Sequence, residues 1–236
     1  MTYTKNTLYG NVDLANGRSF KIESLDDLQH VVWAELDITA WKVELEPVQE
    51  DPGMEQLPHM RMEELMARGR ADNDTIVEYS ITVHYTREFK AVTADPKTFI
   101  QQVIHKTNQG YINSKVALRV RLHCLVESDI EDGLDATTTL TKFKESQDKT
   151  DNVRMSADAT ILLVKDFSWG SVCGLNYFNT VSSGNTLGTV RKSCALGYLS
   201  FGHEVAHGFG LNHDRRVASY SSTDYAFGYI IKVGSM

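Results

Sequence analysis

Alternating apolar and polar positions predict a small β-rich region at the start of this chain. The stretch VDLANGRSFKI has apolar residues on both sides of Asn16 and Gly17, which is a strong signal for a β-hairpin. HVVWAELDI predicts a further strand. Residues 49–75 lose this alternation and contain two of the four prolines. We therefore expect a β-rich region with a linker over residues 1–70 and a second domain over residues 71–236.

In residues 71–236, the pattern of apolar and polar positions predicts strands that alternate with helices along the chain. TIVEYSITVHYT alternates strictly, which predicts a strand whose polar face carries His84 into solvent. Asp95 and Pro96 are typical of the cap and first residue of a helix. Residues 135–146 predict another helix, and ATILLV at 159–164 predicts a strand covered on both faces. This order of elements is that of an α/β (α+β) domain.

Residues 202–214, GHEVAHGFGLNHD, place three histidines and a glutamate in one short segment. On a helix, His203 and His207 lie about 40° apart on one face, so both imidazoles can reach one ion. Glu204 is rotated by about 100° from His203, which suits a base that acts on water bound to the ion rather than a ligand. The opposite face carries apolar residues that would pack into a core: Phe201, Val205 and Phe209.

The third ligand must come from beyond this helix. Catalytic zinc takes three protein ligands and leaves the fourth position to water. His213 lies six residues after His207, so the chain has to leave the helix and turn back, and Gly210 is suited to that turn. We reject a more distant glutamate as the third ligand: no glutamate follows Glu204 in this sequence, so that arrangement would need an untypical aspartate, Asp214 or Asp224, or residues beyond the end. Histidine pairs at this spacing also occur in proteins that bind nothing, but the added Gly210 and His213 favour a zinc site.

The segment NTLGTVRKSCA, which precedes this helix, has two interpretations. It is either an edge strand beside the metal-binding helix or an ordinary loop. An edge strand would expose main-chain groups that pair with an extended peptide.

Composition and charge narrow the class of protein. The chain has 236 residues, 42% of them hydrophobic, and a formal net charge of −7 without long runs of one sign. This charge argues against nucleic acid as a partner. No apolar stretch approaches the roughly 20 residues of a membrane span, so we expect no membrane insertion. The start, MTYTKNTLYG, lacks the apolar core of a secretory signal; either an export signal preceded it or the protein stays inside the cell.

The three cysteines differ in their expected roles. ALRVRLHCLV predicts a strand with Cys124 buried on its apolar face. Cys173 and Cys194 are 21 residues apart and either form a disulfide or remain free thiols. We favour the disulfide, which indicates an oxidising compartment and hence a secreted protein. The glycosylation sequon at Asn73 agrees with this.

HEVAHGFGLNHD resembles the extended zinc motif of the metzincin metallopeptidases at every defining position. Those positions are His203, Glu204, His207, Gly210, His213 and Asp214. Four longer stretches are similar to the bacterial peptidyl-Asp metallopeptidases and their reprolysin-like relatives: TNQGYINSKVALRVRLHCLVE, ADATILLVKD, CGLNYF and VRKSCALGYLSFGHEVAHGFGLNHD. The similarity covers roughly residues 75–236.

This resemblance implies a mixed twisted sheet above a cleft, with an active-site helix that carries the metal ligands. It implies a zinc metalloendopeptidase that uses one Zn²⁺ ion and acts on protein or peptide substrates. The ligands would be His203, His207 and His213, and Glu204 would be the general base that assists attack by zinc-bound water. The resemblance also implies a Cys173–Cys194 disulfide and a zymogen whose propeptide is the β-rich N-terminal region.

One departure concerns the methionine turn that lies beneath the zinc in metzincins. This chain ends KVGSM, so Met236 is the candidate for that methionine, and we expect the chain to stop near the turn. The pocket wall that follows the turn is then missing, which favours an alternative function as a catalytically inactive zinc-binding module for peptides or proteins. No cysteine precedes Cys124, so a propeptide here lacks the cysteine that keeps some metzincins latent.

Overall fold

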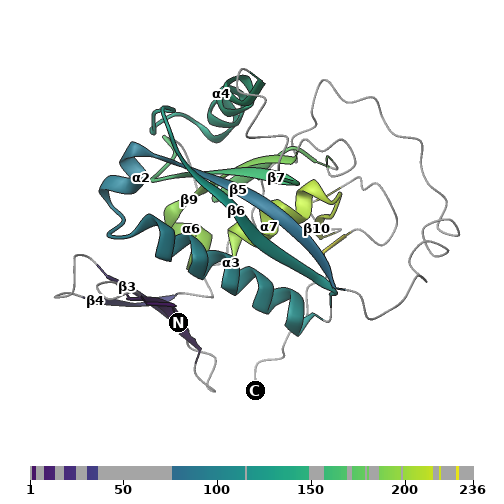
Figure 1. Cartoon of the computed structure of the whole chain (residues 1–236). Coiled ribbons are helices and arrows are strands. Elements are labelled where there is room, and N and C mark those ends of the chain that lie inside the picture. Colours follow the sequence, from purple (N-terminus) through teal and green to yellow (C-terminus); the bar gives the residue numbers. More distant parts are fainter. Residues whose placement is uncertain are drawn as a thin grey trace, which may run out of the picture.

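Figure 1 shows a computed structural model of the whole chain, in which a five-stranded sheet carries helices on both faces. The structure describes residues 2–3, 8–13, 19–24, 31–36, 76–114, 116–148, 157–168, 172–178, 180, 186–197, 199–214, 218 and 227–228. Met236 and residues 37–75, with the predicted linker, lie outside the described residues.

The N-terminal strands form a separate four-stranded sheet. Its strands are β1 (Thr2–Tyr3), β2 (Leu8–Asp13), β3 (Ser19–Ser24) and β4 (Val31–Leu36), in that spatial order. Each neighbouring pair is antiparallel, and Val12 lies opposite Phe20. The two strands predicted around Asn16 and Gly17 are therefore confirmed as β2 and β3, and HVVWAELDI supplies β4.

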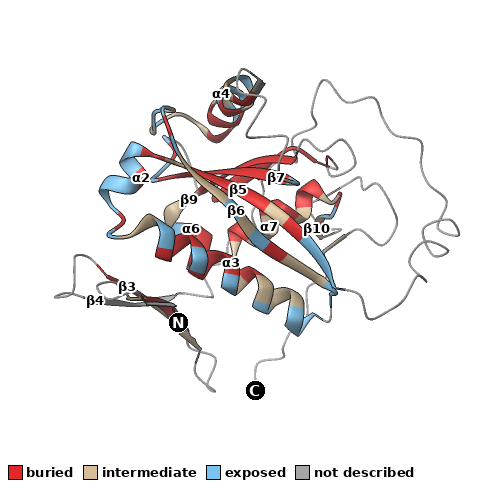
Figure 2. Ribbon diagram, viewed as in Figure 1, coloured by how far each residue is buried: buried red, intermediate tan, exposed pale blue. Residues whose placement is uncertain are grey.

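The main sheet is mixed, which confirms the predicted α/β class. Its strands are β5 (Val77–Thr86), β6 (Leu118–Ser128), β7 (Ala159–Val164), β8 (Gly174–Asn176) and β9 (Thr186–Arg191). They follow the order β6-β5-β7-β9-β8, with β8 antiparallel to β9 and the other pairs parallel. All six residues of β7 are buried, as predicted for ATILLV (Figure 2).

Helices cover the two faces of this sheet unequally. The helices are α2 (Arg87–Ala91), α3 (Pro96–Asn113), α4 (Ala136–Asp148), α6 (Lys192–Gly197) and α7 (Ser200–Gly208). One core cluster joins α3, α6 and α7 to one face, and a second joins α4 to the other (Figure 1). No helix in the described part of the chain is long and apolar enough to cross a membrane.

The starts of two helices follow from local chemistry. Asp95 caps α3 by accepting a hydrogen bond from the Thr98 main-chain N–H at 3.2 Å, and Pro96 is the first helical residue, as predicted. Asp135 accepts from the Thr138 main-chain N–H at 2.9 Å at the start of α4. Both caps satisfy main-chain donors that the first helical turn leaves without a partner.

His84 is buried, so the prediction that it faces solvent is wrong. Its side chain is 6% exposed and its ring lies 5.2 Å from the ring of Phe143, measured between centroids. β5 lies between β6 and β7, and α4 covers the face that carries His84. Strict alternation predicts one solvated face, but here a helix far along the chain covers that second face.

A bulge in β6 corrects the prediction for Cys124. Consecutive residues of β5, Ile81 and Thr82, pair with Leu122 and Cys124, so His123 is an extra residue in β6. An extra residue reverses the faces of the residues that follow it. Cys124 is accordingly half-buried and does not lie on the face that carries Leu122.

The segment NTLGTVRKSCA forms β9 and the start of α6, and β9 is not an edge strand. It pairs with β7 on one side and with β8 on the other, and its first five residues are buried. Both earlier interpretations of this segment, an edge strand or a loop, are therefore wrong. The three-residue β8 lies at that edge of the sheet among the described strands.

Candidate metal centre

The helix α7 presents one face to the core and the other to the candidate metal site. Phe201 and Val205 are fully buried in the cluster that joins α3, α6 and α7 to the sheet. Phe209, which follows the helix, packs on Tyr79 with ring centroids 4.7 Å apart. The apolar face predicted from the sequence therefore fixes the rotation of the helix about its axis.

The chain reverses directly after α7. Gly210 has a φ of +80°, in the left-handed region that a residue without Cβ adopts at little cost. Its N–H donates to the His207 carbonyl at 2.8 Å, and the Leu211 N–H donates to the Ala206 carbonyl at 3.1 Å. The short strand β10 (Asn212–Asp214) follows and carries His213. The predicted turn at Gly210 is confirmed, and β10 pairs with β11 (Phe227–Gly228) in a second small sheet.

The three predicted ligands come together at their ring nitrogens. Nε2 of His203 lies 3.0 Å from Nε2 of His207 and 3.1 Å from Nε2 of His213. All three candidate ligand atoms lie within 4.8 Å of one another. A tetrahedral zinc site with Zn–N bonds of about 2.0–2.1 Å separates its nitrogens by roughly 3.3 Å. The donor set therefore fits a single small cation.

Burial keeps these imidazoles in the neutral form that binds metal. Burial, reinforced by the other two histidines, lowers the pKa of His203 to about 3. Burial likewise lowers the pKa of His207 to about 4 and lowers the pKa of His213. Nδ1 of His207 lies 2.7 Å from the Leu211 carbonyl oxygen. A carbonyl only accepts, so Nδ1 carries the proton and Nε2 of His207 keeps its lone pair.

Glu204 is fully buried beside this cluster and contacts strand β8. Its main-chain carbonyl accepts a hydrogen bond from the side-chain amide of Asn176 at 2.5 Å. Its side chain lies against Gly174. Sequence reasoning missed both β8 residues, because a three-residue strand is too short to produce an alternating pattern.

A disulfide between Cys173 and Cys194 connects the residue before β8 to α6. It joins the pair that the resemblance implied, whereas Cys124 is free. The start of the edge strand is thus attached covalently to the helix that precedes α7.

Comparison of this chain with known proteins identifies its family. Residues 75–231 match the model of metallo-peptidase family M12. Over 184 residues the chain is 29% identical to a peptidyl-Asp metalloendopeptidase of Stenotrophomonas maltophilia, covering 74% of this chain and 43% of that relative. A peptidyl-Asp metalloendopeptidase from another strain is 27% identical over 234 residues, covering 95% of this chain and 53% of the relative. The chain thus spans about half the length of these curated relatives.

A solved structure agrees with the fold. The crystal structure of metalloproteinase-II from Bacteroides fragilis matches with a TM-score of 0.54 at 11% identity, covering 89% of this chain and 68% of that chain. The family match extends over well over half of the sequence and includes the three-histidine segment. This chain therefore belongs to metallo-peptidase family M12, in the metzincin-like group of peptidyl-Asp metallopeptidases.

Proposed function

We propose that this chain is a zinc metalloendopeptidase in which His203, His207 and His213 bind the metal and Glu204 is the general base. The observation that carries the proposal is the convergence of three neutral imidazoles, with Nε2 separations of 3.0 and 3.1 Å from His203. The family and the names of the relatives support peptide hydrolysis as the reaction.

Each residue has a defined task in this mechanism. Zinc, when bound, polarises the scissile carbonyl and lowers the pKa of water from about 15.7 toward 7. Glu204 accepts a proton from the attacking water and transfers it to the leaving amine, a contribution of roughly 10²- to 10⁴-fold. Because Glu204 is fully buried, its carboxylate acts away from bulk solvent, where its orientation is set by its neighbours.

Replacing Glu204 by glutamine tests this assignment directly. Glu204→Gln keeps the size of the side chain and removes the base, so we expect unchanged zinc content and a loss of casein cleavage of at least 10²-fold. Both proteins are assayed after the chain has been cut between Arg68 and Asp74, so that the proposed propeptide does not mask activity. Chelation should then abolish cleavage by the parent, and added zinc should restore it. Cleavage at the parental rate by Glu204→Gln would overturn the role of Glu204.

The competing proposal is a zinc-binding module without catalytic activity. A purely structural site does not need Glu204, whereas this chain carries and buries it. Metal analysis combined with a cleavage assay, on protein already cut between Arg68 and Asp74, separates the two proposals: stoichiometric zinc without cleavage favours the module. The relatives are named peptidyl-Asp metalloendopeptidases, so we extend the catalytic proposal to substrates that contain aspartate. Cleavage rates of two peptides that differ only by Asp or Asn at one position would test this preference.

We further propose that residues 1–70 are a propeptide attached to the catalytic domain over residues 71–236. Tyr9 of β2 is fully buried in the core of the main domain and packs edge-on against Phe99 at 5.4 Å. Glu23 pairs with Lys192 of α6 in a largely buried ion pair. Although burial raises the pKa of Glu23, Lys21 and Lys192 together lower it.

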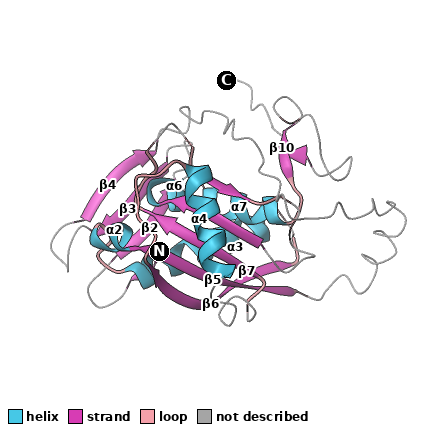
Figure 3. Cartoon of the chain, turned by 90° about the horizontal axis from the view of Figure 1, so that it is seen from above, coloured by secondary structure: helices cyan, strands magenta, loops and turns pink. Residues whose placement is uncertain are grey.

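The strands that carry these contacts do not lie beside β10, the strand that carries His213. In both Figures 1 and 3 the strands β2, β3 and β4 lie toward the end of the main sheet where α2 is, whereas β10 lies toward the opposite end. A zymogen would then need its linker to reach the metal site. We expect proteolysis between Arg68 and Asp74 to precede activity; full turnover by the intact chain would contradict the zymogen.

The disulfide supports secretion into an oxidising compartment.

A further inference from the structure

Strand β8 contacts Glu204 at two points, one on its side chain and one on its main chain. A Cβ atom added to Gly174 would lie 2.7 Å from Cγ, 2.8 Å from Oε1 and 2.9 Å from Cδ of Glu204. All three nearest atoms belong to this one side chain. The Glu204 side chain therefore rests directly on the β8 backbone, where only glycine leaves room for it.

The second contact holds the helix backbone at the same residue. Two residues after Gly174, the Asn176 side-chain amide donates to the Glu204 main-chain carbonyl at 2.5 Å. Side chains two residues apart on a strand point to the same face, so both contacts come from the face of β8 that meets α7. Asn176 is 1% exposed and Glu204 is fully buried, so neither can move into solvent to relieve a clash.

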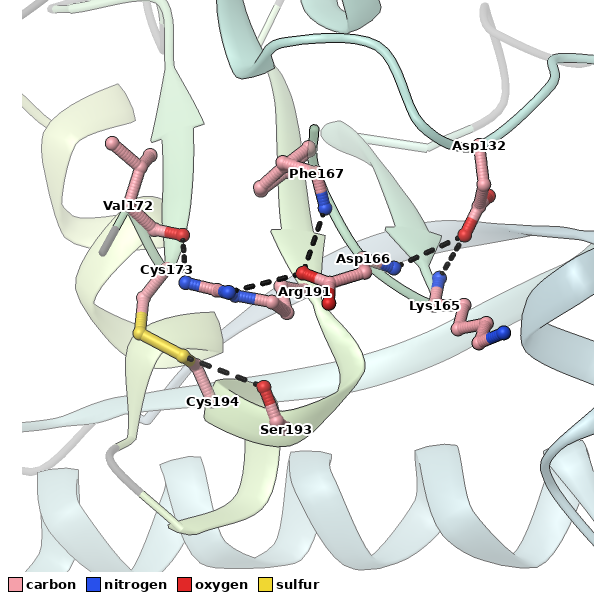
Figure 4. Close-up of polar contacts among 9 residues, drawn as sticks. All are labelled: Asp132, Lys165, Asp166, Phe167, Val172, Cys173, Arg191, Ser193 and Cys194. Carbon is pink, nitrogen blue, oxygen red and sulfur yellow. Dashed lines mark hydrogen bonds and ion pairs between the residues drawn. A yellow bond between two sulfur atoms is a disulfide. The ribbon is translucent and has the colours of Figure 1, made fainter. Parts of the chain in front are cut away.

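The beginning of β8 is itself held from several directions (Figure 4). The Arg191 N–H donates to the Cys173 carbonyl at 2.8 Å, and the Arg191 guanidinium donates to the Val172 carbonyl at 2.6 Å and to Asp166 Oδ1 at 3.0 Å. The Cys173–Cys194 disulfide adds a covalent attachment immediately before Gly174. The backbone directly before Gly174 is therefore restrained by hydrogen bonds from Arg191 and by the disulfide to α6.

We infer that Gly174 is a positioning residue for the general base, and that β8 acts as a fixed support for the Glu204 side chain. The inference rests on the proposed role of Glu204. The three imidazoles would hold the metal and thereby its water, and the absence of a side chain at position 174 leaves the room that the Glu204 carboxylate occupies. Any Cβ at this position displaces the carboxylate without removing an imidazole.

Gly174→Ala tests the catalytic part of this inference. We expect zinc content and KM to stay within about twofold of the parent, kcat to fall at least tenfold, and the acid limb of the kcat/KM pH profile to shift. Gly110→Ala is the matched control, because a Cβ at Gly110 in α3 meets nothing within 4 Å. The control should leave all four quantities unchanged. A parental kcat and pH profile in Gly174→Ala would overturn the inference.

A double-mutant cycle keeps the test decisive if Gly174→Ala folds poorly. The unfolding free energy is measured for the parent, Gly174→Ala, Glu204→Ala and the double variant, all with excess zinc. If the new methyl group meets only the Glu204 side chain, its cost disappears in the Glu204→Ala background. An equal cost in both backgrounds would overturn the contact. This cycle needs no cleavage, so it stands apart from the activity of Glu204→Gln, which decides the proposed function.

Discussion

Replacing His84 by leucine tests whether the main sheet buries a neutral imidazole. His84 lies on β5, is 6% exposed and packs edge-on against Phe143. Its Nε2 atom is buried and has no hydrogen-bond partner among the described residues. Burial alone lowers the pKa of His84 from 6.5 to about 4, because the charged form would lose its hydration.

The lowered pKa of His84 sets both the direction and the size of the change in unfolding free energy with pH. Between pH 4 and 6.5 the unfolded state binds more protons at His84 than the folded state does, so stability falls as the pH drops through this window. The full loss, below pH 4, is on the order of 3 kcal/mol at 1.36 kcal/mol for each pKa unit. At pH 5 the loss already amounts to about 2 kcal/mol.

Urea unfolding at pH 8 and pH 5 measures the effect. Between these values the parent should lose about 2 kcal/mol more unfolding free energy than His84→Leu. The metal-site imidazoles are the same in both proteins, so their titration cancels in the difference. If His84→Leu and the parent lose equal free energy, His84 is not a buried neutral imidazole.

Two further predictions concern stability. Asp95→Ala should lower the unfolding free energy by about 0.5–2 kcal/mol, since the N-cap of α3 is lost, whereas Asp95→Asn should retain most of it; equal losses in urea titrations would argue against capping. Changing both Cys173 and Cys194 to serine should cost about 3 kcal/mol through the freed 21-residue loop, measured against the parent with and without reductant. A parent that is unaffected by reduction would contradict that role.

Local chemistry was sufficient to predict several elements of the fold. Asp95 and Pro96 marked the start of α3, ATILLV marked a strand buried on both faces, and Gly210 marked the reversal after α7. For the cap and the reversal, the determining contacts are within a few residues along the chain. For ATILLV, the continuous apolar run itself indicates burial on both faces. The proposed ligands on α7 were identifiable for the same reason, because helical geometry alone aligns His203 with His207.

Other features depend on contacts between distant segments. His84 is buried because α4 covers the second face of β5, and Cys124 changes faces because one residue, His123, bulges from β6. The position of β9 inside the sheet depends on β8, which is too short to be recognised from a pattern. The contact of Gly174 with Glu204 joins residues 30 apart in the sequence, so nothing local indicates it.

The turn after α7 determines both the position of His213 and the tautomer of His207, although the sequence spacing does not show that the two are connected. Gly210, at a φ of +80°, reverses the chain so that His213 returns to within 3.1 Å of His203 between Nε2 atoms. The same reversal places the Leu211 carbonyl 2.7 Å from Nδ1 of His207, which holds the proton on Nδ1. One backbone reversal therefore supplies the third imidazole and sets the tautomer of the second. A change at Gly210 that displaced His213 would also release His207, so the two ligands cannot be varied independently through this turn.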